Sequence, residues 1–379
     1  MRQWLPRYGL MLRNFATGLS VLTPAGMLNV LAEGLNVGIR ETGLLVTFGA
    51  VILCFGSPLV AWLTTRIDRR TLLVGTLAVM TAGQAASALA PNYAVVLALR
   101  LAMLAVAAIF TPQAASTIAL LVPGKQRSGA ISFVFLGWSL AVAGGLPLIT
   151  IIAGYAGWRG AFAFSALASL VPCVLLAFAL PRKLLGLPLS LQSFNVLARS
   201  RRIVLLLLIT IVPISGQFMV FVYLAPLLQN LVGASHQIVG LMFALYGVTA
   251  FVGNVVATRI VGTLGPWRTS GLFLSSSLTG MLMWAFGAGF LPAMGAGIAF
   301  MGLGFAATNS MQQARLVQAA PELSSASVAL NTSSVYIGQA IGSGVGGVMF
   351  GMGLTQGIGF VGIAFIVAGM AIWAMTRDK

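Results

Sequence analysis

The sequence predicts an all-α membrane protein with twelve transmembrane helices in two pseudo-symmetric six-helix bundles. Hydrophobic residues make up 59% of the 379 residues, and the mean hydropathy is +1.01, whereas soluble domains are about 45–50% apolar. Only 5 acidic residues and 1 histidine are available to build a water-facing surface. In addition, the second half of the chain repeats features of the first.

Each predicted helix is an apolar run long enough to cross a bilayer, which needs about 20 residues. Gly and Pro interrupt these runs, as at Pro91-Asn92 and Gly265-Pro266. The first run follows three arginines and lacks a small-residue cleavage site, so we expect an uncleaved first helix. The predicted spans are 12–32, 42–64, 71–90, 94–121, 129–153, 160–180, 203–229, 238–261, 270–289, 293–313, 325–350 and 357–376.

The longest polar connection, 182–202, divides the chain into an N-terminal bundle, 1–181, and a C-terminal bundle, 203–379. If both termini are cytoplasmic, Arg40 and Arg159 fall in outer loops and Arg100 falls within a span. The other 18 of the 21 basic residues are then cytoplasmic, as the positive-inside rule requires. We therefore expect a cytoplasmic linker at 182–202 and cytoplasmic termini.

The repeat has an offset of about 197 residues. With this shift Gly56 meets Gly253, Asp68 meets Gly265, and Gly145 meets Gly342. Two parallel six-helix repeats are an arrangement that secondary transporters use to form a site at the repeat interface, near the bilayer midplane.

Other function classes fit poorly. The basic residues are scattered between apolar runs, so the net charge of +16 indicates topology rather than nucleic-acid binding. No nucleophile, metal-ligand cluster or acid–base pair stands in the predicted spans, which argues against an enzyme, a metal site or a cofactor. No filter loop or phosphate-binding loop is visible, which disfavours a channel and an ATPase. Cys54 and Cys173 lie in apolar runs and are interpreted as inert thiols.

Several motifs resemble those of the major facilitator superfamily, and most closely its drug, sugar and purine efflux permeases (the drug:proton antiporter group). They are "AWLTTRIDRR" (61–70), "RLAMLAVAA" (100–108), "GWSLAVAGGLPL" (137–148) with "GWRGAF" (157–162), and "SASVALNTSSVYIGQAIGSGVGG" (325–347). The resemblance implies a monomeric carrier in a bacterial-type inner membrane that moves a small molecule by alternating access. It also implies contact with the lipid bilayer and leaves protons open as a coupling ion.

The basic turn at residues 62–70 departs from the family pattern. Thr65 stands where the family usually has Asp, and Asp68 stands where it usually has Gly. One interpretation is a charge cluster that fixes topology beside anionic headgroups. The other is a cytoplasmic gate, whose charges pair between the two halves, and its candidate residues are Arg66, Asp68, Arg69, Arg70 and Arg268.

Arg100 is the most unusual residue within a span, because a guanidinium at a helix centre costs at least about 2.5–3.5 kcal/mol. Two interpretations stay open. It is either a structural arginine that donates to backbone carbonyls of the first helix or to polar side chains, or a cavity residue that attracts substrate. No membrane-embedded acid is available as its ion partner.

Uncharged polar side chains and an aromatic residue complete the candidate substrate cavity. For each polar residue alone, hydrogen bonding between helices is the simpler interpretation. As a set they suit a neutral, amphipathic ligand, because such sites are mostly apolar with a few polar groups. The candidates besides Arg100 are Thr17, Ser20, Gln113, Trp138, Gln217, Tyr223, Asn309, Gln313 and Asn331.

Small residues mark two helices where close packing or motion is expected. A glycine recurs at every fourth position at Gly338, Gly342 and Gly346. On the fifth predicted helix, Gly144, Gly145 and Pro147 allow close approach and interrupt the backbone hydrogen bonds. Static packing and a moving seam between the halves both stay open.

These observations predict a secondary active transporter that exports a small amphipathic molecule, such as a drug, sugar or nucleoside-like metabolite. The predicted spans contain no Asp, Glu or His at their centres, whereas proton-driven pumps use such groups as relays. The alternatives are therefore a facilitator, a uniporter or an importer without carboxylate-based proton coupling, or a transport-incompetent sensor on the same fold.

Overall fold

The computed structural model describes residues 4–63, 67–107, 117–118, 121–122, 127–181 and 191–377. In the N-terminal half the helices are α1 (Trp4–Leu22), η1 (Ala25–Met27), α2 (Leu28–Leu35), α3 (Ile39–Leu63), α4 (Arg69–Ala88), α5 (Tyr93–Ala107), α7 (Arg127–Leu140), the π-helix η3 (Ala141–Gly145) and α8 (Leu146–Ala179). In the C-terminal half they are α10 (Arg201–Val222), α11 (Leu224–Val232), α12 (His236–Phe286), α13 (Leu291–Ala319), η4 (Pro321–Leu323), α14 (Ser324–Gly351) and α15 (Gly357–Met375).

Two of these helices are double passages, because each contains a kink at a glycine. Gly157 in α8 has φ 70° and Gly265 in α12 has φ 74°, the region that a residue with a Cβ rarely adopts. Seven helices in the described part of the chain are long and apolar enough to cross a membrane, or eight if the bent pair α1–α2 is one span. With both passages of α8 and of α12 counted, and with α5 and α14, the fold has its twelve helices, six in each half.

The helix boundaries follow the 197-residue repeat. Adding 197 to the end of α2 at Leu35 gives the end of α11 at Val232, and adding it to the start of α3 at Ile39 gives the start of α12 at His236. The two halves are thus pseudo-symmetric repeats of one six-helix unit, as the sequence predicted.

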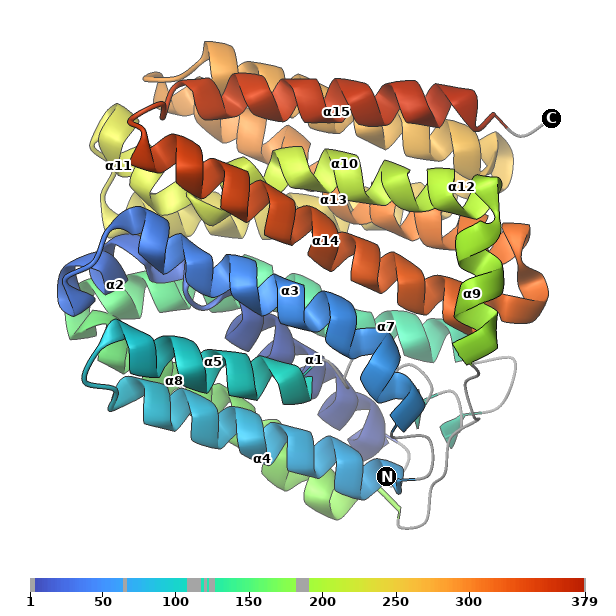
Figure 1. Cartoon of the computed structure of the whole chain (residues 1–379), viewed down its shortest axis with the longest axis horizontal. Helices are drawn as coiled ribbons and strands as arrows, with labels where there is room; N and C mark the ends of the chain where they lie inside the picture. The colour runs from blue at the N-terminus through green and yellow to red at the C-terminus, as the bar shows by residue number, and fades with distance from the viewer. Residues whose placement is uncertain are drawn as a thin grey trace.

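The first helix of each repeat is broken, which the predicted spans 12–32 and 203–229 did not anticipate. The α1 and η1–α2 segments meet at 55°. In the second repeat, Tyr223 interrupts the helix between α10 and α11, with φ −95° and ψ 16°. Both breaks lie on the side of the molecule where α2 and α11 approach each other (Figure 1).

Helix starts are set by short polar side chains. Asp68 caps α4 by accepting a hydrogen bond from the backbone N–H of Thr71 at 3.1 Å. Ser200 caps α10 and Ser235 caps α12, each accepting from the backbone N–H three residues further on. Such caps satisfy an N–H group that has no partner within the helix.

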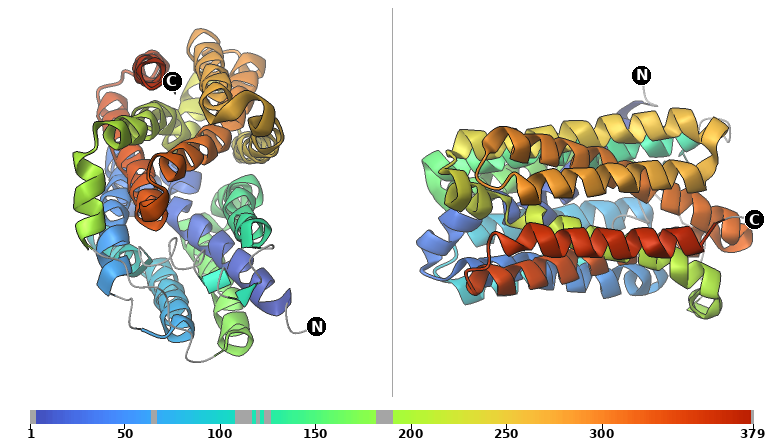
Figure 2. Two further views of the ribbon diagram at one scale, coloured as in Figure 1. Left: turned by 90° about the vertical axis from the view of Figure 1, so that its right-hand side faces the viewer. Right: turned by 90° about the horizontal axis from the view of Figure 1, so that it is seen from above.

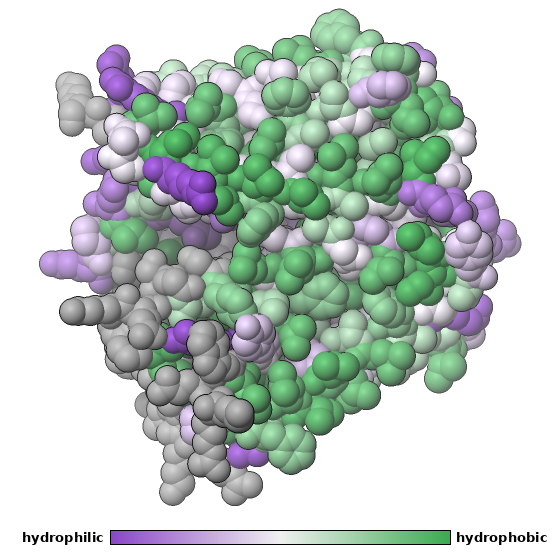
Figure 3. Space-filling view, turned by 180° about the vertical axis from the view of Figure 1, so that it is seen from behind, coloured by the Kyte–Doolittle hydropathy of each residue, from purple (hydrophilic) through white to green (hydrophobic). Residues whose placement is uncertain are grey.

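The helices run roughly along one direction and form two groups, the N-terminal half in blue to green and the C-terminal half in yellow to red (Figures 1 and 2). We call the end with α2 and α11 the distal end, because it lies away from both chain termini (Figure 1). Hydrophobic residues cover the middle of the surface and hydrophilic ones gather toward the two ends (Figure 3). Phe55, Phe178 and Phe286 are each more than 70% exposed, as expected for side chains that face lipid.

The predicted linker contains a helix of its own, α9 (Leu191–Arg199), which contacts α10 and α14. Its Leu197 is buried with Ile203 and Leu206 of α10, while Val196 is 61% exposed. Residues 182–190 lie outside the described residues. The division at 182–202 and its cytoplasmic location stay predictions.

A pair of tryptophans joins the kink of α12 to the end of α15. The rings of Trp267 and Trp373 stack with centroids 4.4 Å apart and 9° between their planes. Each indole N–H donates to the other residue's carbonyl, at 3.2 Å from Trp267 and 3.0 Å from Trp373. The pair therefore fastens the last helix to the C-terminal bundle.

We expect Trp373→Ala to reduce the free energy of unfolding by about 3 kcal/mol. The substitution removes a large packed ring, its stacking on Trp267 and its indole hydrogen bond to Trp267 O. Thermal unfolding in detergent followed by circular dichroism measures this. Met375→Ala, two residues away and 66% exposed, is the control and should unfold like the wild type. Equal melting curves for Trp373→Ala and Met375→Ala would contradict a fastening role.

Candidate functional site

The break in the first helix is held by Arg100. Pro24 has no backbone N–H, so it cannot donate to the carbonyl of Ser20, four residues earlier. The guanidinium supplies this donor: Nη1 donates to Ser20 O at 3.1 Å and Nη2 to Val21 O at 2.5 Å. Its Nε donates to Leu45 O of α3 at 2.7 Å. One cation thus joins α5 to the C-terminal end of α1 and to α3.

The arginine is enclosed by its own bundle. Its side chain is 2% exposed, and Gly49 of α3 lets α5 approach closely beside it, since a Cβ there would lie 2.5 Å from Leu104 Cδ1. Of the two interpretations, the structure shows the donor to backbone carbonyls. A role of Arg100 in a substrate cavity stays a prediction. Sequence reasoning missed the acceptor on α3, Leu45 O, although Pro24 is a visible signal that the carbonyl of Ser20 lacks its helical donor.

Thr17 and Ser20 also point into the N-terminal bundle rather than toward the other half. Thr17 Oγ1 donates to Arg13 O of its own helix at 3.1 Å, and Ser20 Oγ lies 3.4 Å from Ser169 Oγ of α8. One turn further, Thr23 donates to Ser165 Oγ at 3.2 Å. The hydroxyls of Ser20 and Thr23 therefore join α1 to α8, which is the simpler interpretation given above for single polar residues, while that of Thr17 bonds within α1.

In the C-terminal half, Gln217 of α10 belongs to a buried network with one residue from each of the two passages of α12. Its amide nitrogen donates to Ser277 Oγ at 3.3 Å, and its carbonyl oxygen accepts from Tyr246 Oη at 3.4 Å. All three residues are at most 2% exposed. The network fixes the direction of Tyr246, whose ring belongs to the aromatic cluster described below.

Asn331 and Asn309 form a second polar chain. Thr210 of α10 donates to Asn331 Oδ1 at 2.8 Å, and Asn331 Nδ2 donates to Asn309 Oδ1 at 2.8 Å. The chain joins α10, α14 and α13. Gln313 is partly buried one turn beyond Asn309, and Gln113 lies outside the described residues.

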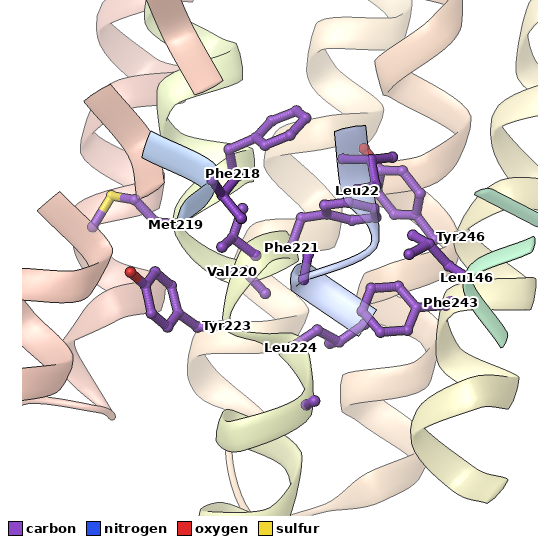
Figure 4. Close-up of a cluster of buried hydrophobic side chains, with 14 of the residues drawn as sticks. Leu22, Leu146, Phe218, Met219, Val220, Phe221, Tyr223, Leu224, Phe243 and Tyr246 are labelled. Atoms are coloured by element: carbon purple, nitrogen blue, oxygen red, sulfur yellow. The ribbon is translucent and has the colours of Figure 1, made fainter. Parts of the chain in front are cut away.

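Five rings gather where the two halves meet. The aromatic cluster consists of Phe218, Phe221, Phe243, Tyr246 and Phe305, with neighbouring centroids 4.7–6.0 Å apart. Leu22 and Leu146 of the N-terminal half belong to the same buried core (Figure 4). Trp138 is partly buried and packs against this core. The cluster lies beside both helix breaks, at the interface of the repeats.

The halves are in direct contact on the distal side of this cluster. Thr47 Oγ1 of α3 and Ser343 Oγ of α14 are 2.9 Å apart. Gln237 of α12 donates to Tyr155 of α8 at 2.8 Å, and Asn29 of α2 donates to Gln229 of α11. These contacts join uncharged side chains.

Tyr223, predicted to line the cavity, lies in this distal contact instead. It is fully buried, and its hydroxyl donates to Ser343 O of α14 at 2.9 Å. Tyr223 thus lies between the bundles, and its role in a substrate cavity stays a prediction.

The candidate gate residues have local roles in the structure. Asp68 caps α4, and its carboxylate also accepts from the Thr71 hydroxyl at 3.2 Å. Arg70 donates to Ala177 O of α8, within the same half. Arg69 is buried and Arg268 is exposed, while Arg66 lies outside the described residues. Pairing between the halves stays a prediction.

The glycines predicted to serve packing or motion differ in what they contact. Gly338, Gly342 and Gly346 pack against α10 in their own half, at backbone atoms of Ile211, Ser215 and Met219. On the other helix, Gly145 faces Leu19 of α1, and Gly144 has no neighbour within 4 Å of its Cβ position. The static interpretation describes this packing, and motion at these residues stays a prediction.

The π-helix and Pro147 meet the other half. A Cβ at Gly247 of α12 would overlap the backbone of Ala143, and a Cβ at Gly240 would lie 3.5 Å from Pro147 O. A π-helix is rare and often marks a functional position. Here it brings helix backbones of the two halves into contact.

Known proteins resemble this chain along nearly its whole length. "Inner membrane transport protein YdhP" of Escherichia coli (strain K12) is 28% identical over 371 residues, which cover 97% of this chain and 94% of that protein. "Probable sugar efflux transporter" of Mannheimia succiniciproducens is 29% identical over 364 residues, covering 95% and 90%.

A solved structure supports the fold. The bacterial homolog to the human lysosomal transporter Spinster, in an inward-facing and occupied conformation, superposes with a TM-score of 0.78 at 15% identity, covering 98% of this chain and 96% of that one. The sequence model of the family "Major Facilitator Superfamily" matches residues 10–343 of this chain. With twelve helices in two repeats and this match, the chain is a multi-pass membrane protein that belongs to the Major Facilitator Superfamily.

Proposed function

We propose that the chain is a secondary active transporter that exports a small, uncharged, amphipathic molecule across a bacterial-type inner membrane. The observation that carries this proposal is the aromatic cluster at the interface of the two repeats, beside a break in the first helix of each. Aromatic faces suit the apolar part of such a ligand, and a few placed polar groups fix its orientation. The relatives named as inner membrane transport and sugar efflux proteins support export.

The positions of the acidic residues favour a second candidate, a facilitator without carboxylate-based proton coupling. The described acids are Glu33 near the end of α2, Glu41 in the first turn of α3, Asp68 before α4 and Glu322 in η4. All four stand at helix ends. A proton relay needs ionisable groups along the path, and this arrangement supplies none at the aromatic cluster.

The proposed orientation places the distal end outside the cell. It rests on the 18 basic residues that the positive-inside rule assigns to the cytoplasm. The distal contacts described above then close the outer side.

Ligand binding and flux test the function together. A thermal-shift screen of the purified protein against metabolites and antibiotics at two pH values identifies binders. We expect uncharged binders to exchange across proteoliposomes that contain the protein. Phe221→Ala should lower the initial exchange rate about tenfold, equivalent to about 1.4 kcal/mol of lost aromatic contact. Phe178→Ala, 84% exposed, is the matched control and should leave the rate unchanged.

Two outcomes would change the conclusion. A protein that binds an uncharged molecule but exchanges none would be the transport-incompetent sensor. Complete loss of gradient-driven flux on adding an uncoupler, together with an inactive Glu33→Gln variant, would assign proton coupling to Glu33 and reject the facilitator.

A further inference from the structure

We propose that Tyr223 closes the distal gate by inserting its ring into a socket of glycines that both halves contribute. The inference rests on the alternating access proposed above, and it assigns the closing step to one side chain. Tyr223 is the residue that interrupts the helix between α10 and α11. Its ring is fully buried at the contact between the two repeats.

The C-terminal half holds one side of the ring. The Tyr223 hydroxyl donates to Ser343 O at 2.9 Å, and the ring stacks on Phe350 with centroids 5.8 Å apart and 20° between the planes. A Cβ at Gly346 would lie 3.0 Å from ring carbons, and one at Gly347 would lie 2.5 Å from the hydroxyl oxygen. The ring of Tyr223 therefore packs against α14, and it has no room to move closer to that helix.

The N-terminal half holds the other side through one residue. A Cβ at Gly43 of α3 would overlap the Tyr223 hydroxyl and would lie 2.7 Å from Cζ. Only hydrogen fits at this position while the halves are closed. One turn along α3, Thr47 meets Ser343 at 2.9 Å, and on the other side of Gly43 the stem of Arg40 covers Gly347 and Gly351. The face of α3 around Gly43 thus fits over the socket.

Opening the distal side must lift α3 away from the ring. The hydrogen bond to Ser343 O and the stacking on Phe350 are internal to the C-terminal half, so they survive that motion. The contact with Gly43 does not. Closure consequently requires that the residue at position 43 has no side chain to overlap the Tyr223 ring, and any side chain there will favour separated halves.

The position of the ring also connects the gate with the aromatic cluster. Phe221, two residues before Tyr223, lies in the cluster, and Leu224 directly after it belongs to the same buried core (Figure 4). A ligand that shifts the end of α10 at the cluster will therefore shift the gate residue.

Distances between spin labels on the two halves test the proposal without any substrate. Labels at Glu33 on α2 and Asn230 on α11, in a chain whose two cysteines are replaced by alanine, report the distal separation by double electron–electron resonance. We expect Gly43→Ala to move the distance distribution to a longer population. Gly75→Ala and Gly262→Ala, at positions with no neighbour within 4 Å, should match the parent protein.

A double-mutant cycle shows whether the ring is the cause. Tyr223→Ala alone should lengthen the distances, because closure loses its filling residue. In that background, Gly43→Ala should have no further effect, since the atoms it would overlap are gone. An unchanged distribution in Gly43→Ala, or a Gly43→Ala effect that persists in the Tyr223→Ala background, would overturn the proposal.

If Gly43→Ala does not purify as a folded protein, the single variant Tyr223→Ala still tests the proposal. In that case Tyr223→Ala alone must lengthen the distances, and an unchanged distribution contradicts the gate. Because the readout is a distance, it separates this inference from the proposed function: a sensor that moves no substrate would still show a Tyr223 gate.

Discussion

Replacing Arg100 by alanine will abolish transport and lower the thermal stability of the protein together. The substitution removes the donors to Ser20 O and Val21 O, and Pro24 prevents the helix from supplying one itself. A buried polar group left without a partner costs about 1–3 kcal/mol, so the two carbonyls together give a loss of about 2–6 kcal/mol. Melting curves of the purified variant and exchange assays in proteoliposomes measure the two effects.

The parallel loss distinguishes the role of Arg100 seen in the structure from a substrate contact. A cavity residue would lose transport while the melting temperature stayed unchanged. Arg100→Lys should fall between the alanine variant and the wild type, because an ammonium cannot reach three carbonyls with the geometry of a guanidinium. Arg259→Ala, an exposed arginine of α12, is the control. Wild-type stability and flux in Arg100→Ala would reject the role.

Gly342→Ala will destabilise the C-terminal bundle by about 1–3 kcal/mol, the usual cost of forcing extra atoms into a packed contact. Its Cβ would overlap the carbonyl oxygen of Ser215 and lie 3.0 Å from the Cβ of Phe218. Both neighbours belong to α10, and backbone atoms cannot rotate away. We expect a lower melting temperature and a smaller folded fraction in detergent.

Gly144→Ala is the comparison for this variant, because both residues belong to the glycines predicted to serve packing or motion. Gly144 has no neighbour within 4 Å of its Cβ position, and alanine favours a helix over glycine by about 1 kcal/mol. Its melting temperature should equal or exceed that of the wild type. A larger loss of stability in Gly144→Ala than in Gly342→Ala would contradict the packing seen here.

The sequence was a good guide to the architecture. The apolar runs and the Gly and Pro residues between them predict where helices lie, and the 197-residue repeat holds where α2 ends and α3 begins, which match the end of α11 and the start of α12. The breaks in the first helix of each repeat were missed. Pro24 is a visible signal for the first break, and Pro226 is one for the second, because neither proline has a backbone N–H to donate to the carbonyl four residues earlier, Ser20 and Val222 respectively.

The candidate site was harder to predict, for a physical reason. In a soluble helix the contrast between polar and apolar faces shows which side is buried. Lipid is as apolar as a protein core, so that contrast fades in a spanning helix. Thr17, Ser20 and Gln217 were correctly recognised as polar groups within spans, yet their directions depend on helix rotation. In the structure Ser20 and Gln217 bond to other helices of their own bundle, and Thr17 bonds to a carbonyl of its own helix.

The hydrogen bonds from Arg100 to the end of α1 have a consequence for the order in which the chain reaches its native structure. The ribosome delivers residues 4–35 to the translocon well before residue 100 has been synthesised, and until then the carbonyls of Ser20 and Val21 lack the guanidinium that serves them in the finished protein. The opening segment of the chain therefore acquires its native shape only after the fourth span has inserted. A nascent chain stalled before that point would hold these two carbonyls in the hydrocarbon without a donor from Arg100, at a cost of several kcal/mol for each unsatisfied group.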